Sequence, residues 1–328
     1  MVLKDQTVLV TGATGFLGGE IARRAAAQGA HVLALARRPD RDRYIKDVPG
    51  ISVIMGDITD RDHTRTLMAG VDYVIHAAAA LGGSLEAQST VNIHGTYNVA
   101  RAAAECGVKR LVHISTIAVY GYRVREDVTE ETPCDPGADP YHITKVGAER
   151  TVVDIGYQYG LNYAIIRPGM IYGPRSVTWT RSMFRLVKRG PIWLGSGGGS
   201  AYPVHVSDVA DLALLAAEHP AAQGEAFNCT PDPSPTWREF LGAYAELIDR
   251  KRWIGVPPFL LRAGAPVISM LSPAHAQAKD LKDLVPFILD HHTYRMDKAA
   301  ERLGWSPQVD LKAGVQSCVP YLKEKGLM

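Results

Sequence analysis

The residues most clearly suited to chemistry are Tyr141 and Lys145, in the segment Tyr141-His142-Ile143-Thr144-Lys145. On a helix, side chains four positions apart lie on one face, about one turn from each other. A free phenol has a pKa of about 10 and is a poor base at neutral pH, so a neighbouring ammonium would favour its ionised form. The pair could then take a proton from an alcohol, or return one to a carbonyl that is being reduced. By itself the pair is weak evidence, because Tyr and Lys at this spacing occur on many solvent-exposed helices.

A glycine-rich turn upstream of the pair indicates a bound cofactor that could act together with it. Gly12-x-x-Gly15-x-x-Gly18 follows the apolar run Thr7–Thr11 and precedes a helical pattern. The first glycine permits a tight turn, the second lets the backbone approach a pyrophosphate, and the third allows close packing of helix on strand. Phosphates can then rest on the free N–H groups at the start of the helix. The sequence therefore predicts a dinucleotide cofactor whose nicotinamide exchanges a hydride beside Tyr141.

The cofactor type is indicated by the end of the second predicted strand. Sites that prefer NAD usually have an acidic residue there to bind the ribose hydroxyls. This chain has Ala36 followed by Arg37 and Arg38. Two guanidinium groups can pair with a 2′-phosphate, which favours NADP(H), although NAD(H) is possible. The alternative is that both arginines belong to a solvated loop.

A substrate oxygen would also need a hydroxyl donor near the tyrosine. Ser115 and Thr116 follow the predicted strand Arg110–Ser115, and either can supply that donor. The residues alone leave the choice between them open.

Composition limits the class of protein. The 328 residues are 46% hydrophobic and 21% charged with a net charge of +2, which is typical of a globular enzyme and gives no footprint for nucleic acid. Four scattered cysteines have no metal-binding spacing, so we expect free thiols in a reducing compartment and no metal site. The apolar stretch Trp253–Leu271 contains three prolines and an arginine, so a transmembrane segment is not expected. No secretory signal precedes the first strand, and we expect a cytoplasmic location.

Short β-rich runs alternate with helical patterns through the first half of the chain, which predicts an α/β fold of the Rossmann type, a doubly wound parallel sheet. The expected strands are Thr7–Thr11, His31–Ala36, Ser52–Met55, Tyr73–His76, Arg110–Ser115 and Tyr163–Arg167, and the expected helices are Gly15–Gln28, Asp60–Met68, Ser89–Cys106 and Tyr141–Tyr159. After Pro168 the composition changes, which predicts a smaller C-terminal α/β lobe for the substrate. The expected division assigns 1–170 plus 203–230 to the dinucleotide-binding domain and 171–202 plus 231–328 to the substrate lobe.

Several further motifs accompany the turn and the Tyr–Lys pair. They are His76-Ala77-Ala78-Ala79, Asn92, Ser115–Gly121, Arg167–Pro174, Pro203–Ala210 and Leu303–Pro307. Together with Thr11–Gly18 and Tyr141–Lys145 they resemble the extended short-chain dehydrogenase/reductase family, of the NAD-dependent epimerase/dehydratase type. The resemblance covers nearly the whole chain and is specific for the family, but not for a substrate.

The resemblance implies roles for individual residues. Thr116 stands 25 positions before Tyr141, as the catalytic Ser/Thr does in the sugar-nucleotide epimerases, with Ser115 as the fallback. Tyr141 would be the acid/base, and Lys145 would also bind the nicotinamide ribose. The implied cofactor-binding set is Gly12, Thr14, Gly15, Phe16, Leu17, Gly18, Arg37, Arg38, Asp57, Ile58, Ala77, Ala78, Ala79, Asn92, Ser115, Tyr141, Lys145, Pro168 and Met170. Within it, Asp57 and Ile58 match the pair that contacts adenine. The resemblance also implies a homodimer through the helices near Ser89–Cys106 and Tyr141–Tyr159.

Three departures from the family narrow the reaction. The family's 4,6-dehydratases have a motif like Thr-Asp-Glu at the position where this chain has Thr116-Ile117-Ala118. This chain therefore lacks a carboxylate there that could protonate a leaving hydroxyl group. Nucleotide-sugar epimerases usually place an arginine at the position of Ala201, where it grips the diphosphate. Their later Arg-Pro-Gly-Asp segment has no counterpart in Asp283–Thr293. A buried diphosphate needs paired cations, so these losses disfavour a nucleotide-sugar substrate.

The expected second lobe is rich in large apolar side chains. Trp179, Trp193, Tyr202, Phe259, Leu260, Leu261 and Ile268 could form an apolar pocket, as in the branches that resemble dihydroflavonol reductases and 3β-hydroxysteroid dehydrogenases, or they could fill the core of the lobe. Arg175, Arg181, Arg185, Lys188 and Arg189 could meet an anionic substrate such as a thioester carrier, or form a solvated helix face. His76 and His205 are expected to be structural.

The sequence thus predicts an enzyme, an NADP(H)-dependent oxidoreductase that interconverts a ketone and a secondary alcohol on a hydrophobic small molecule. The alternative is a sugar epimerase with a tightly held NAD(P). A third hypothesis, a cofactor-sensing protein without turnover, is disfavoured by the intact set of Thr116, Tyr141 and Lys145.

Overall fold

The large sheet confirms the predicted parallel α/β architecture. The computed structural model describes residues 3–38, 43–124, 127–190, 197–250, 257, 259–260, 285 and 287–328. Seven strands of this described part pair in parallel in the order β3-β2-β1-β4-β5-β6-β9. They are β1 Thr7–Thr11, β2 His31–Ala36, β3 Ile51–Met55, β4 Tyr73–His76, β5 Arg110–Ile114, β6 Tyr163–Pro168 and β9 Glu225–Cys229. Six match the predicted strands to within one residue at each end.

The strand order reverses between β1 and β4, which pair side by side with Thr11 opposite His76. The chain leaves these two strands toward opposite halves of the sheet, and such a switch point opens a crevice at their carboxyl ends. Gly12 and Ala77 follow the two strands directly. The predicted phosphate turn therefore lies at the position where parallel α/β folds bind ligands.

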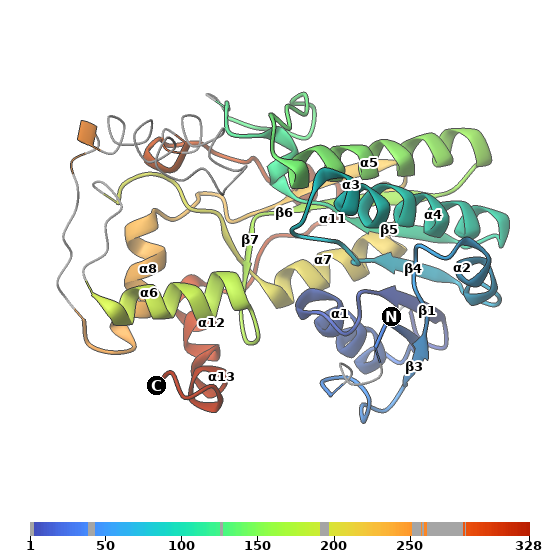
Figure 1. The fold of residues 1–328 in the computed structure, drawn as a ribbon, viewed down its shortest axis with the longest axis horizontal. Helices are drawn as coiled ribbons and strands as arrows, with labels where there is room; N and C mark the ends of the chain where they lie inside the picture. Colours follow the sequence, from blue (N-terminus) through green and yellow to red (C-terminus); the bar gives the residue numbers. More distant parts are fainter. Residues whose placement is uncertain are drawn as a thin grey trace.

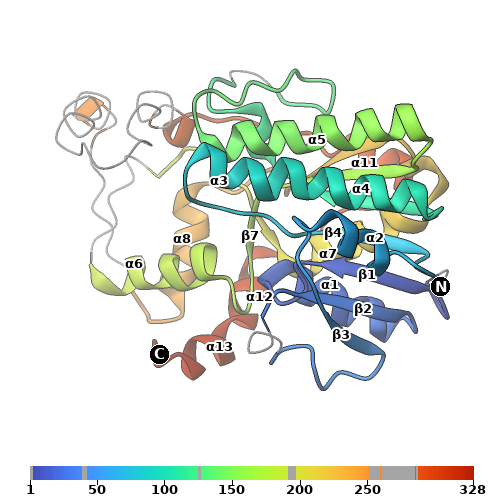
Figure 2. The ribbon, with the colours of Figure 1, turned by 45° about the vertical axis from the view of Figure 1, so that its right-hand side comes forward.

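Helices cover both faces of the sheet (Figure 1). Helices α1 (Phe16–Ala27) and α7 (Val206–Glu218) pack together on one face, and α2 (Arg61–Leu67), α4 (Gly95–Glu105) and α5 (Pro140–Tyr159) lie on the other. On that face α3 (Leu85–Ser89), α4 and α5 form one layer (Figure 2). Neighbouring residues of a strand point to opposite faces. Accordingly Val8 and Val10 join the hydrophobic cluster beneath α1 and α7, whereas Leu9 joins the cluster beneath α4 and α5. Both faces are thus buried, as a parallel sheet requires.

The predicted helix Ser89–Cys106 is not one regular helix. The chain forms α3 (Leu85–Ser89), then a π-helical turn η2 (Thr90–His94), then α4. A π-turn keeps the residues helical, so the periodicity of the sequence does not reveal it. Its consequence is local, because the wider turn contains Asn92, one of the predicted site residues.

A second group of elements forms a smaller body beside the large sheet (Figure 1). Strands β7 (Met170–Tyr172) and β8 (Pro203–His205) pair in parallel, and helices η4 (Val177–Ser182), α6 (Met183–Arg189), α8 (Trp237–Glu246), α12 (Leu311–Ser317) and α13 (Val319–Glu324) accompany them. Phe184, Phe240, Tyr244 and Leu322 are buried in its hydrophobic cluster. This packing supports the smaller lobe, although its exact division from the first domain stays a prediction.

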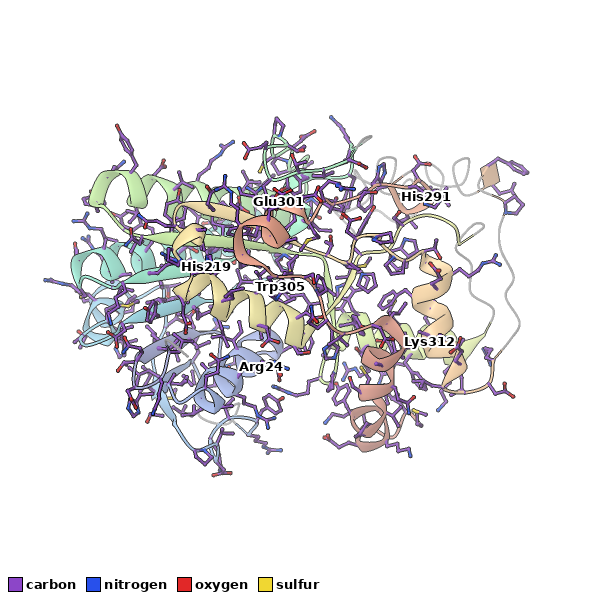
Figure 3. All side chains as sticks on the ribbon, turned by 180° about the vertical axis from the view of Figure 1, so that it is seen from behind. Arg24, His219, His291, Glu301, Trp305 and Lys312 are labelled. Carbon is purple, nitrogen blue, oxygen red and sulfur yellow. The ribbon has the colours of Figure 1, made fainter. Side chains whose placement is uncertain are left out.

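The chain returns to the large sheet near its end. Helix α11 (Asp297–Leu303) and Trp305 pack into the cluster beneath α7 (Figure 3). The following backbone is fixed by Asp208 near the start of α7, whose carboxylate accepts hydrogen bonds from Gln308 N (3.1 Å) and Val309 N (3.2 Å). The predicted division assigned these residues to the substrate lobe. These contacts bring α11 beside the large sheet before α12 packs in the smaller body, and the predicted division itself stays a prediction.

Within the described residues, no helix is both long enough and apolar enough to cross a membrane. Trp193, Leu261 and Ile268, and most of the apolar segment Val256–Leu271, lie outside the described residues. Phe259 and Leu260 are described and are exposed.

Candidate functional site

A cavity of about 1370 Å³ lies at the carboxyl ends of the parallel strands. It is lined by residues that directly follow β1, β2, β3, β4 and β5, and by the end of β6, so the sheet supplies its floor. All the predicted catalytic and cofactor-binding residues line this one cavity except Asn92. Residues scattered over 159 positions of sequence, from Gly12 to Met170, are therefore brought together by the fold.

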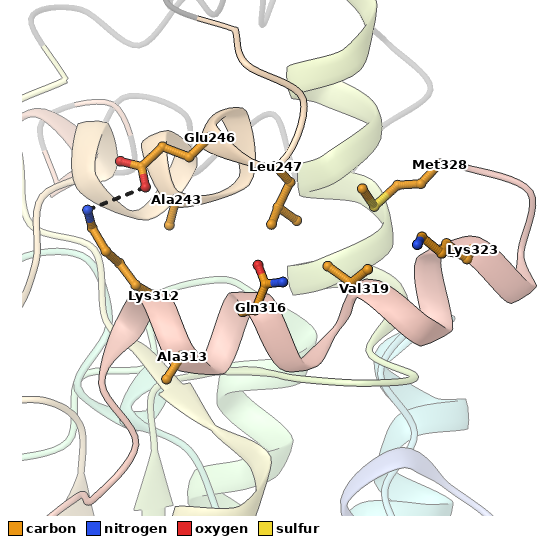
Figure 4. A pocket seen from close by; sticks show the side chains of 9 residues that line it. All are labelled: Ala243, Glu246, Leu247, Lys312, Ala313, Gln316, Val319, Lys323 and Met328. Carbon is orange, nitrogen blue, oxygen red and sulfur yellow. Dashed lines mark ion pairs between the residues drawn. The ribbon is translucent and has the colours of Figure 1, made fainter.

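A second hollow of about 610 Å³ lies in the smaller body, between α8 and the helices α12 and α13 (Figure 4). Its edge carries the ion pair between Lys312 and Glu246, with 3.4 Å between the charged atoms. None of the predicted site residues lines it. The cavity at the strand ends is therefore the candidate active site.

The phosphate turn has the close packing that its glycines predict. Gly12 has a φ of +70°, and a Cβ there would lie 2.8 Å from the Ala77 carbonyl oxygen. A Cβ on Gly18 would overlap the Gly12 carbonyl. Gly15 is the N-cap of α1 and offers no side chain, so no side-chain hydrogen bond caps the first turn of that helix. Uncapped N–H groups and the positive end of the helix dipole are what a phosphate requires.

The rest of the cavity also fits a nicotinamide dinucleotide. Arg37 and Arg38 are exposed at its rim after β2, and Asp57 and Ile58 line it after β3. Ala77, Ala78 and Ala79 line it after β4, with small side chains that leave room for a ligand. The turn and the alanines therefore form an elongated floor that leads from the rim to Tyr141.

The predicted catalytic residues lie together in one wall. Helix α5 begins with Pro140 at its first position, and the Asp139 carboxylate accepts hydrogen bonds from the backbone N–H of Tyr141 (2.7 Å) and His142 (3.3 Å). This cap fixes the first turn of α5, which contains Tyr141. Thr116 follows β5 and lines the same cavity as Tyr141, and its hydroxyl lowers the pKa of the Tyr141 phenol. The same oxygen accepts from Ala118 N at 3.2 Å.

The surroundings of Tyr141 keep its phenol protonated. Burial raises the pKa of the phenol to about 12, against the lowering effect of the Thr116 hydrogen bond and with a further rise from the Asp139 charge. At neutral pH the group is therefore a phenol, which can give a proton to an oxygen that gains charge. A role as proton donor would need no prior ionisation of the tyrosine.

Lys145 is 2% exposed and is held from the strand side. Its Nζ donates to the Ile114 carbonyl at 2.7 Å and to Nε2 of His113 at 3.2 Å. An ammonium has three N–H donors, so one remains for the cavity that Lys145 lines. Burial lowers the pKa of Lys145 to about 8, although the Glu149 carboxylate acts in the opposite direction.

His113 is the partner that the sequence analysis missed. Burial, followed by the nearby charge of Lys145, lowers its pKa well below the ordinary value, so the ring is neutral and Nε2 can accept. Its Nδ1 has no hydrogen-bond partner among the described residues. No motif marks this position, because a histidine inside a buried strand reads as a core residue.

His76 belongs to a buried chain of hydrogen bonds that runs from Thr11 through Thr96 to Asn92. Thr96 donates its hydroxyl proton to the Asn92 carbonyl at 2.6 Å, so its oxygen must accept the contact of 2.9 Å from Nε2 of His76. Burial lowers the pKa of His76 to about 3, so the ring carries one proton, on Nε2. Its Nδ1 must then accept from the Thr11 hydroxyl at 2.7 Å. The expected structural role of His76 is consistent with this geometry.

Asn92 lies behind the cavity wall instead of lining it. Its amide bonds the Ala80 backbone twice, with Oδ1 accepting from Ala80 N (2.7 Å) and Nδ2 donating to Ala80 O (2.9 Å). Nδ2 also donates to the Thr144 hydroxyl of α5 at 3.0 Å. Asn92 thus connects the loop after β4 to the catalytic helix. We interpret it as a residue that positions the site.

His205 is likewise engaged within the fold. Its Nδ1 lies 2.5 Å from the Ser207 hydroxyl and its Nε2 lies 3.2 Å from the Ser317 hydroxyl. These contacts connect β8 and the start of α7 to α12. His205 does not line the cavity.

The substrate end of the cavity is largely aromatic. Its lining includes Tyr122, Met170, Trp179, Tyr202, Trp237, Phe287 and Tyr294. Trp179 and Trp237 lie with ring centroids 6.3 Å apart, and Tyr202 packs edge-on against Tyr294 at 4.7 Å. Of the residues predicted for an apolar pocket, Trp179 and Tyr202 lie here. The other aromatic residues come from segments whose place in the cavity depends on tertiary packing, which no local pattern reveals.

Within the described residues, no cluster of three or more His, Cys, Asp or Glu side chains is arranged to hold a metal ion. The four cysteines are described, and each is free.

Comparisons with known proteins agree with this geometry. The family model described as "NAD dependent epimerase/dehydratase family" matches residues 8–230. The chain is 30% identical over 337 residues to the UDP-glucose 4-epimerase of Mycolicibacterium smegmatis. This alignment covers 97% of this chain and 98% of the relative. It is 29% identical over 318 residues to the 4-hydroxy-2-methyl-3-oxo-4-farnesyl-3,4-dihydroquinoline-1-oxide ketoreductase of Stigmatella aurantiaca, over 94% of both chains.

Solved structures show the same fold. The UDP-glucuronic acid 4-epimerase from Bacillus cereus in complex with NAD superposes with a TM-score of 0.79 at 20% identity, over 98% of this chain and 99% of that one. The relatives include both a ketoreductase and epimerases, so the family is shown and the individual reaction is not. With a model match over most of its length and a site built from the expected residues, the chain belongs to the NAD dependent epimerase/dehydratase family.

Proposed function

We propose that this protein is an NADP(H)-dependent reductase that converts a ketone on a hydrophobic small molecule into a secondary alcohol, and catalyses the reverse oxidation. The observation that carries the proposal is that Thr116, a protonated Tyr141 and Lys145 line the same cavity, which fits a dinucleotide. The ketoreductase from Stigmatella aurantiaca gives a precedent for this reaction in a relative of nearly equal length.

The catalytic residues act on the carbonyl oxygen. A bound nicotinamide supplies the hydride for the carbonyl carbon in reduction and accepts it in oxidation. The Thr116 hydroxyl orients the substrate oxygen, and the Tyr141 phenol gives that oxygen its proton as charge develops on it. The Lys145 ammonium favours the phenolate that remains, because an opposite charge nearby stabilises it. Tyr141 then regains a proton from solvent, which completes the cycle.

The lining of the cavity supports an uncharged, partly aromatic substrate. The side chains beyond Tyr141 include two tryptophans, Trp179 and Trp237, with Met170 and Phe287. Such walls bind flat apolar molecules through burial of apolar area and aromatic contacts. Ser176 and Thr178 add hydroxyl groups to the same lining.

Dehydration is disfavoured by the absence of a suitably placed acid. Two carboxylates are found among the described lining residues, Asp57 and Asp139. Asp57 accepts from the backbone and hydroxyl of Thr59, and Asp139 is the N-cap of α5. Ile117 and Ala118 beside Thr116 carry no acidic group.

The second candidate is a nucleotide-sugar epimerase, which the relative from Mycolicibacterium smegmatis favours. Against it, Ala201 is wholly buried in the apolar cluster of the smaller body and offers no cation. An epimerase returns its hydride to the substrate and shows no net cofactor consumption. Two incubations of the purified protein separate the candidates: one with NADPH and a panel of steroids, flavonoids, aryl ketones and β-ketoacyl thioesters, and one with UDP-glucose. Carbonyl-dependent NADPH consumption supports the reductase, whereas interconversion of UDP-sugars without consumption refutes it.

We further propose a homodimer through the outer face of α4 and α5. Tyr97, Val153 and Tyr157 are exposed there, and Tyr157 is 92% exposed. A second copy would bury these side chains, and a monomer at micromolar concentration by light scattering would refute this assembly.

We also propose a cytoplasmic location, which the four free cysteines support.

A further inference from the structure

Arg175 has an unusual backbone conformation. It lies in the loop between β7 and η4, and its φ of +78° is in the left-handed region that residues other than glycine seldom adopt. Such a conformation is strained and persists where surrounding contacts impose it. The contact that the loop makes here is with the phosphate turn, since Nη2 of Arg175 lies 3.4 Å from the Gly15 carbonyl oxygen.

The guanidinium is held in a prepared position. Its Cζ lies 3.5 Å above the centre of the Tyr44 ring, and the Tyr44 hydroxyl donates to Glu20 at 3.0 Å. Gly19 makes room for this stack, because a Cβ there would lie 3.2 Å from Nη1 of Arg175 and 3.1 Å from the Tyr44 ring. The arginine therefore packs on the first turns of α1 with little freedom to move.

The charge of Arg175 lacks a carboxylate partner. Within the described part of the chain no acidic side chain forms an ion pair with it, and its buried Nη1 has no hydrogen-bond partner. Burial lowers the pKa of the guanidinium, with Tyr44 and Glu20 acting in the opposite direction. A partly desolvated cation with an unused donor is costly unless an anion completes it.

The neighbouring groups indicate which anion that is. Arg175, Gly15 and Phe16 line the same cavity, and the start of α1 has no side-chain cap. The other four cations of the segment, Arg181, Arg185, Lys188 and Arg189, do not line the cavity. Arg185 and Arg189 are exposed on α6, and Lys188 donates to the Leu327 carbonyl at 2.6 Å. Of the five cations that the sequence analysis grouped together, Arg175 is therefore the one placed to bind an anion in the cavity.

We propose that Arg175, which follows β7 of the smaller body, binds the pyrophosphate of the dinucleotide together with the turn after β1. The cofactor would then contact both parts of the protein, and its binding would hold the β7–η4 loop against α1. This inference rests on cofactor binding in the proposed function, but not on the identity of the carbonyl substrate.

Equilibrium titration by cofactor fluorescence tests the proposal without turnover. Arg175→Met should weaken NADH and NADPH by the same factor, about 10-fold or more, because both share the pyrophosphate. Arg175→Lys should fall between Met and wild type, since a lysine keeps the charge without the forked geometry. The matched control is Arg23→Met, because Arg23 stacks on the same Tyr44 ring at 4.6 Å and does not line the cavity. Arg23→Met should leave both affinities unchanged.

Two results would overturn the inference. A loss confined to NADPH would place Arg175 at the 2′-phosphate, and unchanged affinities with a lowered melting temperature would make it a brace for Tyr44. Melting curves without cofactor establish that each variant is folded. The proposed function fails separately, if the wild-type protein shows this binding pattern and reduces none of the carbonyl compounds.

Discussion

The buried Lys145 ammonium donates to a neutral histidine, His113, across 3.2 Å. Together with the Ile114 carbonyl, this contact takes up two of the three ammonium donors and leaves the third for the cavity. The lysine is thereby aimed by strand β5, while Tyr141 is aimed by the capped first turn of α5. The two members of the pair are adjacent on one helix, yet different elements orient their reactive atoms.

Replacement of the acid should abolish most of the chemistry. Tyr141→Phe removes the proton donor and should lower kcat by about 10²–10⁴-fold, with cofactor affinity retained because the ring remains. Steady-state kinetics and cofactor titration measure the two effects. Tyr321→Phe is the matched control, since Tyr321 lies on α13 outside the cavity lining and its loss of a hydroxyl should leave kcat nearly unchanged. Full turnover by Tyr141→Phe would remove Tyr141 from the mechanism.

The hydroxyl donor can be assigned by a comparison of neighbours. The Thr116 hydroxyl lowers the pKa of the Tyr141 phenol, whereas the Ser115 Oγ is buried without a hydrogen-bond partner in the described part of the chain. Thr116→Ala should therefore cost about 10²–10³-fold in kcat, and Thr116→Ser should restore most of it. Ser115→Ala should have little effect. The reverse ranking would transfer the role to Ser115.

Reduction should slow in alkaline solution. The pKa of Lys145 is lowered to about 8, chiefly by burial, so the ammonium is present below this pH and is lost above it. Because the phenolate left after proton transfer depends on that charge, kcat/KM for carbonyl reduction should fall as the pH rises through about 8. A pH–rate profile tests this, and Lys145→Met should lack that limb. A wild-type profile without a fall well above pH 8 would contradict the expectation.

Acid should destabilise the fold through His76. Its pKa is lowered from 6.5 to about 3, so between these values the unfolded chain binds a proton that the folded chain does not. Stability should therefore fall as the pH falls below 6.5, by about 1.4 kcal/mol for each pH unit from this residue. Urea unfolding across pH measures the slope, which His76→Asn should reduce.

The choice of cofactor should depend on the rim of the cavity. Arg37→Ala and Arg38→Ala should each weaken NADPH by about 10–100-fold and leave NADH nearly unchanged, because the 2′-phosphate alone distinguishes the two cofactors. Fluorescence titration measures both affinities. Arg61→Ala, on α2 and outside the cavity lining, is the control. Equal losses for NADH and NADPH would refute the NADP preference.

Much of the fold could be predicted because its signals are local. The alternation that places Val8 and Val10 on one face and Leu9 on the other belongs to a strand, and glycine at 12 and 18 is required by contacts that the turn itself creates. The start of α5 also follows from Asp139-Pro140, a helix-start signature that the sequence analysis did not use. Local rules thus fixed the elements and the floor of the site.

The remainder depends on contacts between distant segments. The partnership of His113 with Lys145 spans 32 positions, and the contact of Arg175 with Gly15 spans 160. Neither is visible in spacing or composition. Likewise, α11 is a short helix with one apolar side, and nothing in that side determines which of two clusters it joins. Asn92 was assigned to the cofactor by resemblance, and that assignment stays a prediction; its contacts with Ala80 and Thr144 depend on tertiary packing and could not be predicted from the sequence.

The chain of hydrogen bonds from Thr11 through His76 and Thr96 to Asn92 contains no formal charge. Dissolved ions screen charges, and they have little to act on in a neutral, buried path. The alignment of the phosphate turn with the catalytic helix should therefore tolerate a wide range of salinity, even though the grip on an anionic cofactor weakens as salt is added. Added salt should therefore release the bound cofactor at concentrations that leave the geometry of the site unchanged.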